Sequence, residues 1–179
     1  LKQHKGYEDL FEGYNEADLH RGQIEKMLRL PVYRDFSKLY RFANVEQRKF
    51  LALYFKRYEV SVIKECLNTV FDHRDVVLNL SIFDEFFNKH SQLDINLLAS
   101  SRTIEELIAN LKGTEYYAPL SQLADIERPT LFDYEMTLDL YYFAQMWKDR
   151  SKVVTKRDLE ELTAAWGSKF DMLNLQWIY

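Results

Sequence analysis

Residues 131–149 read Leu-Phe-Asp-Tyr-Glu-Met-Thr-Leu-Asp-Leu-Tyr-Tyr-Phe-Ala-Gln-Met-Trp-Lys-Asp, and this stretch decides the fold class of the chain. It contains neither Gly nor Pro, and apolar side chains fall on nearly every side of the helix that it predicts, which indicates burial on most faces. A longer helix is predicted from Val45 to about Val70, because Phe55, Val62 and Cys66 recur at helical spacing. Since no segment shows sustained strand alternation, the sequence predicts an all-α fold.

The composition favours long helices with few tight turns. The 179 residues include only 5 Gly and 3 Pro, while 47% of them are hydrophobic. Helix starts are predicted where a capping side chain precedes Asp, Glu or Gln by three residues, at Asn44, Ser81, Thr103, Thr130 and Thr155. Gly113 and Gly167 stand where helices are predicted to end.

The longest uncharged stretch, residues 116–124, is too short to cross a bilayer. The single cysteine, Cys66, lies on the apolar side of the helix at 45–70 and is interpreted as a core residue. One cysteine allows no internal disulfide and fits a reducing compartment. We therefore expect a soluble, cytoplasmic chain.

Two short patterns occur twice and predict stacked helical units. Tyr33-x-x-Phe36-x-x-Leu39 matches Tyr117-x-x-Leu120-x-x-Leu123, and Tyr58-Glu59-Val60-x-x-Ile63 matches Phe170-Asp171-Met172-x-x-Leu175. The second pair is further apart than the first, so the second copy is predicted to hold one additional helix. This interpretation divides the chain into a first unit, 1–75, and a second unit, 76–179.

Charge is spread unevenly along the chain. The net charge is −4, which argues against nucleic acid as a partner. Residues 21–64, however, hold 11 Lys/Arg and 4 Asp/Glu. The simpler interpretation is a solvated helix surface, and the alternative is a surface for an acidic protein or anionic headgroups. Under the alternative, the partner-facing side chains are Arg48, Lys49, Lys56 and Arg57.

No residue pattern in the sequence indicates catalysis or a metal site. His4, His20, His73 and His90 lack the Glu-x-x-His spacing of helical di-metal sites, and we expect them on the surface or at helix caps. No Gly-rich phosphate loop is present. Glu135 and Asp139 lie one helical turn apart, which could suit acid–base chemistry; a stabilising Arg or Lys on a neighbouring helix is the favoured interpretation. Asp171 and Asn174 are expected to connect the last helix to its neighbours.

Three motifs in order resemble a known family. They are Ser101-x-Thr103-Ile-Glu-Glu-Leu-x-x-x-Leu-x-Gly113-Thr114-x-Tyr116-x-x-x-Leu120, Glu135-x-x-Leu138-Asp139-x-x-Tyr142, and Asp171-x-x-Asn174-x-x-Trp177-Ile-Tyr179. This series resembles the C-subunit family of the prokaryotic V-type ATPases, to which the d subunit of the eukaryotic enzyme also belongs. The structural motif residues are then Thr114, Tyr116, Glu135, Asp139, Asp171, Asn174 and Trp177.

The resemblance implies a funnel-shaped protein of three related helical units, without catalytic residues or cofactors of its own. It implies a peripheral position on the cytoplasmic face of the membrane, between the rotor ring and the central stalk of a rotary ATPase. The expected partners are the proteins that build that ring and stalk. Because family members are longer, the chain is interpreted as a fragment, whose apolar end at Leu175, Trp177 and Ile178 is expected to pack on preceding helices or on another copy.

The sequence leaves two other classes of protein to consider. A generic helical-repeat adaptor that binds a protein or peptide would show the same repeated patterns. A helical hydrolase or metal enzyme is disfavoured because the histidine pairs that such sites use are missing.

Overall fold

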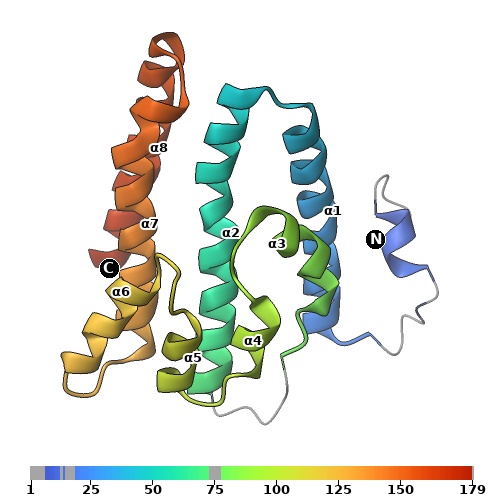
Figure 1. Cartoon of the computed structure of the whole chain (residues 1–179), viewed down its shortest axis with the longest axis vertical. Helices are drawn as coiled ribbons and strands as arrows, with labels where there is room; N and C mark the ends of the chain where they lie inside the picture. The colour runs from blue at the N-terminus through green and yellow to red at the C-terminus, as the bar shows by residue number, and fades with distance from the viewer. Residues whose placement is uncertain (1–6, 13, 15–18, 73–77, 179) are drawn as a thin grey trace. The chain divides into compact units, whose positions relative to one another are not determined.

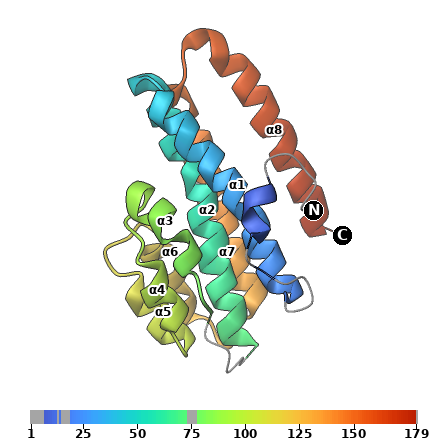
Figure 2. The same ribbon diagram turned by 90° about the vertical axis from the view of Figure 1, so that its right-hand side faces the viewer.

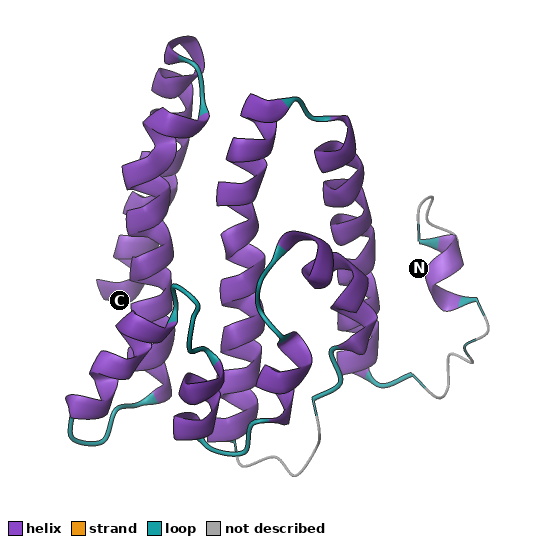
Figure 3. Ribbon diagram, in the orientation of Figure 1, coloured by secondary structure: helices purple, strands orange, loops and turns teal. Residues whose placement is uncertain are grey.

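A computed structural model describes residues 7–12, 14, 19–72 and 78–178, with the backbone alone described at residues 8, 9, 124, 125 and 176–178. Every regular element among these residues is a helix, so the all-α prediction is confirmed (Figure 3). None of the helices in these ranges is both long and apolar enough to cross a membrane. The chain forms two compact units, residues 1–43 and 44–179.

The first unit contains the 3₁₀ helix η1 (Glu8–Phe11) and the helix α1 (Arg21–Phe42). Leu10 and Phe11 of η1 form a small apolar cluster with Met27 of α1, and each of the three is buried. His20 is the N-cap of α1, as expected for a capping histidine, and its backbone N–H donates to Oε1 of Gln23.

The second unit is built on two long helices, α2 (Val45–Phe71) and α7 (Leu131–Val153), which pack against each other (Figure 1). A third long helix, α8 (Lys156–Ile178), turns back after α7 and runs apart from it toward its C-terminal end (Figure 2). The connection from α2 to α7 contains short helices: η3 (Ser81–Phe83), α3 (Asp84–His90), α4 (Ile95–Ser100), α5 (Ile104–Asn110), α6 (Tyr117–Ser121) and η4 (Gln122–Asp125).

Side-chain caps start the helices where the sequence predicts them. Asn44, Thr103 and Thr130 accept hydrogen bonds from backbone N–H groups three residues later, at the starts of α2, α5 and α7. Asp94 caps α4 in the same way and was not predicted. Ser81 instead begins η3, and its backbone N–H donates to Asn79. Each cap supplies an acceptor to an N–H group that the helix itself leaves unpaired.

The two glycines expected at helix ends behave differently. Gly113 lies in the turn after α5 with φ of 88°, the left-handed conformation that glycine tolerates best. Gly167 does not end a helix, because α8 continues through it to Ile178. A Cβ at Gly167 would lie 3.9 Å from the Trp147 ring of α7, so this glycine marks a helix–helix contact rather than a helix end.

The prediction that α7 is buried on most faces is wrong. Tyr134, Leu138, Tyr142 and Met146 form one buried stripe at four-residue spacing, whereas Phe132 is 56% and Leu140 52% exposed. The stripe packs on α2. Cys66 of α2 is 1% exposed, so the interpretation of this cysteine as a core residue is confirmed.

The compact units do not coincide with the predicted repeat units, 1–75 and 76–179. The helix α2 groups with the residues that follow it, because its apolar side packs against α7. The internal repeat and the funnel of three units stay predictions.

Candidate functional site

The two carboxylates that the sequence singled out lie on the side of α7 that meets α2. A carboxylate oxygen of Asp139 lies 2.6 Å from Nζ of Lys64, so the predicted cation on a neighbouring helix is confirmed. Glu135 has a different partner, because its Oε1 accepts from the Nδ2 amide of Asn68 at 2.8 Å. Both carboxylates therefore act as links between α2 and α7.

These links define the register of an antiparallel helix pair. Moving four residues forward on α2, from Lys64 to Asn68, corresponds to moving four residues back on α7, from Asp139 to Glu135. Beyond them the rings of Phe71 and Tyr134 lie with their centroids 5.7 Å apart. A slip of one helical turn, about 5.4 Å, would break each of these pairs.

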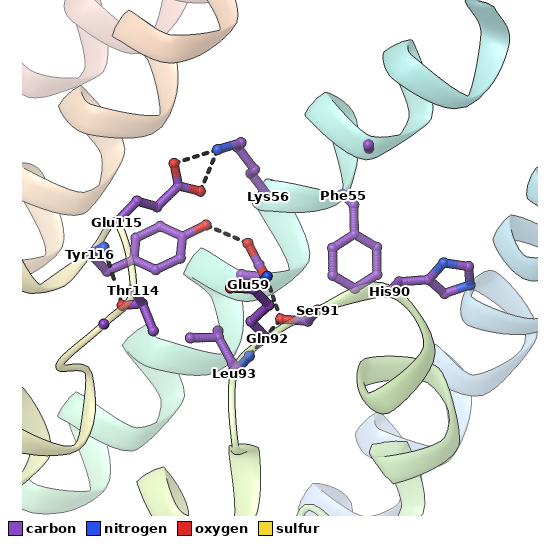
Figure 4. Close-up of a pocket in the computed structure, with 12 residues that line it drawn as sticks. Phe55, Lys56, Glu59, His90, Ser91, Gln92, Leu93, Thr114, Glu115 and Tyr116 are labelled. Carbon is purple, nitrogen blue, oxygen red and sulfur yellow. Dashed lines mark hydrogen bonds and ion pairs between the residues drawn. The ribbon is translucent and has the colours of Figure 1, made fainter. Parts of the chain in front are cut away.

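The motif residues Thr114 and Tyr116 shape the turn between α5 and α6. The Thr114 hydroxyl donates to the backbone oxygen of Leu111 at 2.7 Å, and its Oγ1 accepts from the Tyr116 N–H at 3.3 Å. These bonds direct the Tyr116 side chain inward, where it is 1% exposed. Its hydroxyl donates to Oε2 of Glu59 on α2 at 2.6 Å (Figure 4).

Glu59 is the central residue of this cluster. Its carboxylate is buried and also accepts from the Ser91 hydroxyl, which follows the end of α3 (Figure 4). Burial raises the pKa of Glu59, against the opposing effect of the hydrogen bonds from Ser91 and Tyr116. Burial, together with the carboxylate of Glu59, raises the pKa of Tyr116, so the phenol keeps its proton and remains a donor.

Lys56 forms a second link one turn away. It pairs with Glu115, whose Oε2 also accepts from the Tyr141 hydroxyl of α7 at 2.8 Å. Burial raises the pKa of Tyr141, and the hydrogen bond to Glu115 acts in the same direction. The structure places the charge of Lys56 in a bridge within the chain, and a role of this residue in facing a partner protein stays a prediction.

The other predicted partner-facing residues lie on the exposed part of α2. Arg48 is exposed, and Lys49 pairs with Glu46 at 2.9 Å. Arg57 lies over the rings of Tyr54 and Tyr58, 5.2 and 5.7 Å from their centroids. A role of these three residues in partner binding stays a prediction.

A pocket of about 270 Å³ adjoins Glu59 and is lined by Lys56, His90, Ser91, Thr114, Glu115 and Tyr116. His90 is half-buried rather than on the surface, and its ring packs against those of Phe55 and Phe86, whose centroids are 5.6 and 5.4 Å away. Burial lowers the pKa of His90, and the charge of Lys89 adds to the effect.

The acidic groups that line the pocket are engaged with hydroxyl or ammonium groups of the chain, an arrangement typical of a structural joint. Among the described residues, no group of His, Cys, Asp or Glu is placed to hold a metal ion.

Several predicted residues lie elsewhere. Asp171 and Asn174 are exposed on α8, so their connection to neighbouring helices stays a prediction. The structure does not describe the side chain of Trp177. The same holds for Ile178, Tyr179, His4 and His73. Leu175 is 57% exposed rather than packed on the preceding helices.

The importance of Glu59 was not recognised from the sequence, although a signal was available. Glu59 stands four residues after Phe55 and three before Val62, within the apolar side of the helix. A carboxylate in that place requires a buried partner. The identity of the partners, Ser91 and Tyr116, depends on how the short helices fold back onto α2.

Comparison with known proteins gives a consistent result. The family described as ATP synthase (C/AC39) subunit matches the chain over residues 1–179. The C subunit of the A-type ATP synthase of Methanosarcina mazei is 30% identical over 152 residues, which are 81% of this chain and 39% of that protein. The corresponding C subunit of Methanocaldococcus jannaschii is 23% identical over 156 residues, 86% of this chain and 38% of that protein. The chain thus spans about two fifths of the length of these relatives, and no solved structure matches it significantly.

Proposed function

Because the chain belongs to the ATP synthase (C/AC39) subunit family, we propose that it is part of a non-catalytic central-stalk component of a rotary ATPase. In this role it couples the membrane rotor ring to the central shaft during ATP-linked transport of protons or sodium ions. Its partners are the ring and stalk subunits, and its place is peripheral, on the cytoplasmic face of the membrane. The family match over the whole chain is the observation that carries this proposal.

The geometry of the second unit supports a mechanical role. A part that transmits torque must resist sliding between its helices, and close-packed interiors transmit strain because they deform little. The contact between α2 and α7 combines a buried apolar stripe with polar links at Lys64–Asp139 and Asn68–Glu135. The apolar stripe holds the helices together, and the polar links oppose slippage along their axes.

The test is co-purification of the full-length gene product, carrying an affinity tag, from membranes of its source cells. We expect ring and central-stalk subunits of a rotary ATPase to be recovered with it in constant proportion. Recovery of the protein without these subunits, or with an unrelated peptide-binding assembly alone, contradicts the proposal. The generic helical-repeat adaptor would then be the favoured alternative.

Charge reversal sharpens this test, since exposed basic residues can steer association with acidic surfaces. The variant Arg48→Glu with Lys49→Glu changes exposed residues and leaves the Lys56–Glu115 bridge intact. The matched control, Arg157→Glu with Lys169→Glu, makes the same change of charge on exposed positions of α8. Weaker recovery of partners with the first variant alone would identify the basic part of α2 as an interface. Equal recovery would make it an ordinary solvated surface.

A further inference from the structure

A single buried carboxylate joins three separate segments of the second unit. Glu59 stands near the middle of α2, Ser91 follows α3, and Tyr116 precedes α6 (Figure 4). Both hydroxyls donate to Glu59, which is only 9% exposed. The pocket beside Glu59 lies between these same segments.

We propose that Glu59 is a proton-responsive clamp, in which uptake of a proton by the carboxylate holds residues 91–93 and 113–117 more firmly against α2. Loss of the proton loosens the two segments and lets water reach the carboxylate through the adjoining pocket. The proposal concerns these contacts alone and does not depend on the proposed function.

The hydrogen-bond geometry accommodates both protonation states. Ser91 Oγ accepts from the backbone N–H of Leu93 at 3.0 Å, so one lone pair of this oxygen is still available. When Glu59 is ionised, the Ser91 hydroxyl donates to it. When Glu59 is protonated, rotation of that hydroxyl lets Ser91 accept from the new carboxyl proton, while Tyr116 continues to donate to Oε2.

The charges around Glu59 largely balance one another. From α2, Lys56 favours the ionised carboxylate, and from the turn before α6, Glu115 opposes it; these two residues pair with each other. Burial lowers the pKa of His90, which lines the pocket, and so disfavours a positive charge on its ring. From α7, Tyr141 donates to Glu115 and packs its ring edge-on against Tyr116. Burial is consequently the largest influence on the pKa of Glu59.

The direction of the response follows from linkage. In the closed arrangement the pKa of Glu59 lies above its ordinary value of 4.5, whereas opening to water returns the pKa toward that value. The closed form therefore binds the proton more tightly than the open form. Its extra stability is fully present below pH 4.5 and is lost as the pH rises through the raised pKa of Glu59.

The experiment is backbone amide exchange of the chain across the interval from about pH 5 to about pH 7.5, corrected for intrinsic exchange rates. The reporters are the amides of Leu93 and Tyr116, which donate to side chains within the two clamped segments. We expect their protection to fall with rising pH, by about tenfold for each unit of pKa shift. In Glu59→Gln, which imitates the protonated carboxyl, the protection should not change with pH.

The control variant Glu46→Gln, on an exposed position of the same helix, should keep the wild-type response. The proposal is overturned if amide protection falls with rising pH in Glu59→Gln as it does in the wild type. It is also overturned if protection does not fall in the wild type. If Glu59→Gln does not fold, Tyr116→Phe decides. Removing a donor that favours the ionised form raises the pKa of Glu59 further, so the loss of protection at Leu93 should move to higher pH. An unchanged midpoint in that variant also overturns the proposal.

Discussion

The two helix pairs that involve α7 are built on different principles. The helices α2 and α7 carry completely buried side chains such as Ile63 and Leu138, and polar links at Lys64–Asp139 and Asn68–Glu135 join the two helices. Between α7 and α8, the contact is mostly aromatic, with the rings of Phe143 and Phe170 4.8 Å apart, and one polar link accompanies it, from Nε of Arg150 to the Thr163 hydroxyl at 3.2 Å.

The exposure of the side chains also differs between the two helix pairs. Trp166 is the one buried side chain among those described on α8, while Met172 is 66% exposed. Aromatic contacts supply adhesion without specifying one register, whereas polar pairs lose their bonds when the register changes. The first pair should consequently behave as one rigid body, and α8 should open at lower free energy.

The largest effect is expected from truncating the α2–α7 stripe. Leu138→Ala removes a side chain that is 0% exposed and should lower the free energy of unfolding by about 2–5 kcal/mol. Leu140→Ala is the matched control, because this leucine is two residues away and 52% exposed, and it should change stability by less than about 0.5 kcal/mol. Urea unfolding measures both. Equal losses in the two variants would show that the stripe is not the main core.

The next effect concerns the turn that delivers Tyr116 to Glu59. Gly113→Ala forces an L side chain into a backbone with φ of 88°, which should cost about 1–2 kcal/mol. Gly113→Asn should cost less, because asparagine visits this conformation more readily. The measurement is the urea midpoint of each variant. A wild-type midpoint for Gly113→Ala would mean that the turn adopts another conformation without penalty.

A smaller effect is expected from the ion pair that links α2 to α7. A double-mutant cycle with Lys64→Met and Asp139→Asn should give a coupling energy of about 0.5–1 kcal/mol, because both side chains are about one quarter exposed and water screens them in part. The more exposed pair Lys49–Glu46 serves as the control and should couple more weakly. A coupling energy at Lys64–Asp139 no larger than in the control would show that this pair does not help to fix the register of α2 against α7.

The smallest effect should appear on α8 and with the opposite sign. Gly167→Ala places a methyl group in ordinary contact with the Trp147 ring and removes a helix-interior glycine, which should stabilise α8 by about 0.5–1 kcal/mol. Amide exchange along α8 detects this change locally. If exchange slows equally in α2 and α7, α8 opens together with them, and the contrast between the two helix pairs is lost.

The sequence was sufficient for features that depend on local rules. The caps Asn44 and Thr130, the length of α2 and a cation for Asp139 follow from capping chemistry, periodicity and the cost of burying a charge. Gly167 was misinterpreted because the sequence does not show that a tryptophan from α7 lies over it. The exposure of Leu140 likewise depends on which helices surround α7. The candidate site depends on tertiary structure even more strongly, since Ser91 and Tyr116 approach Glu59 only through the arrangement of short helices.

The buried thiol of Cys66 is a natural probe for the rate at which the core opens. It is the only cysteine of the chain and lies on the buried side of α2, where it is 1% exposed. A thiol reagent can reach its sulfur only after the core around α2 opens, so the modification rate of the unaltered chain measures how often that core opens. No introduced label is needed, and separation of α8 alone leaves that rate unchanged. The rate of thiol modification therefore reports opening of the core around α2 separately from opening of α8.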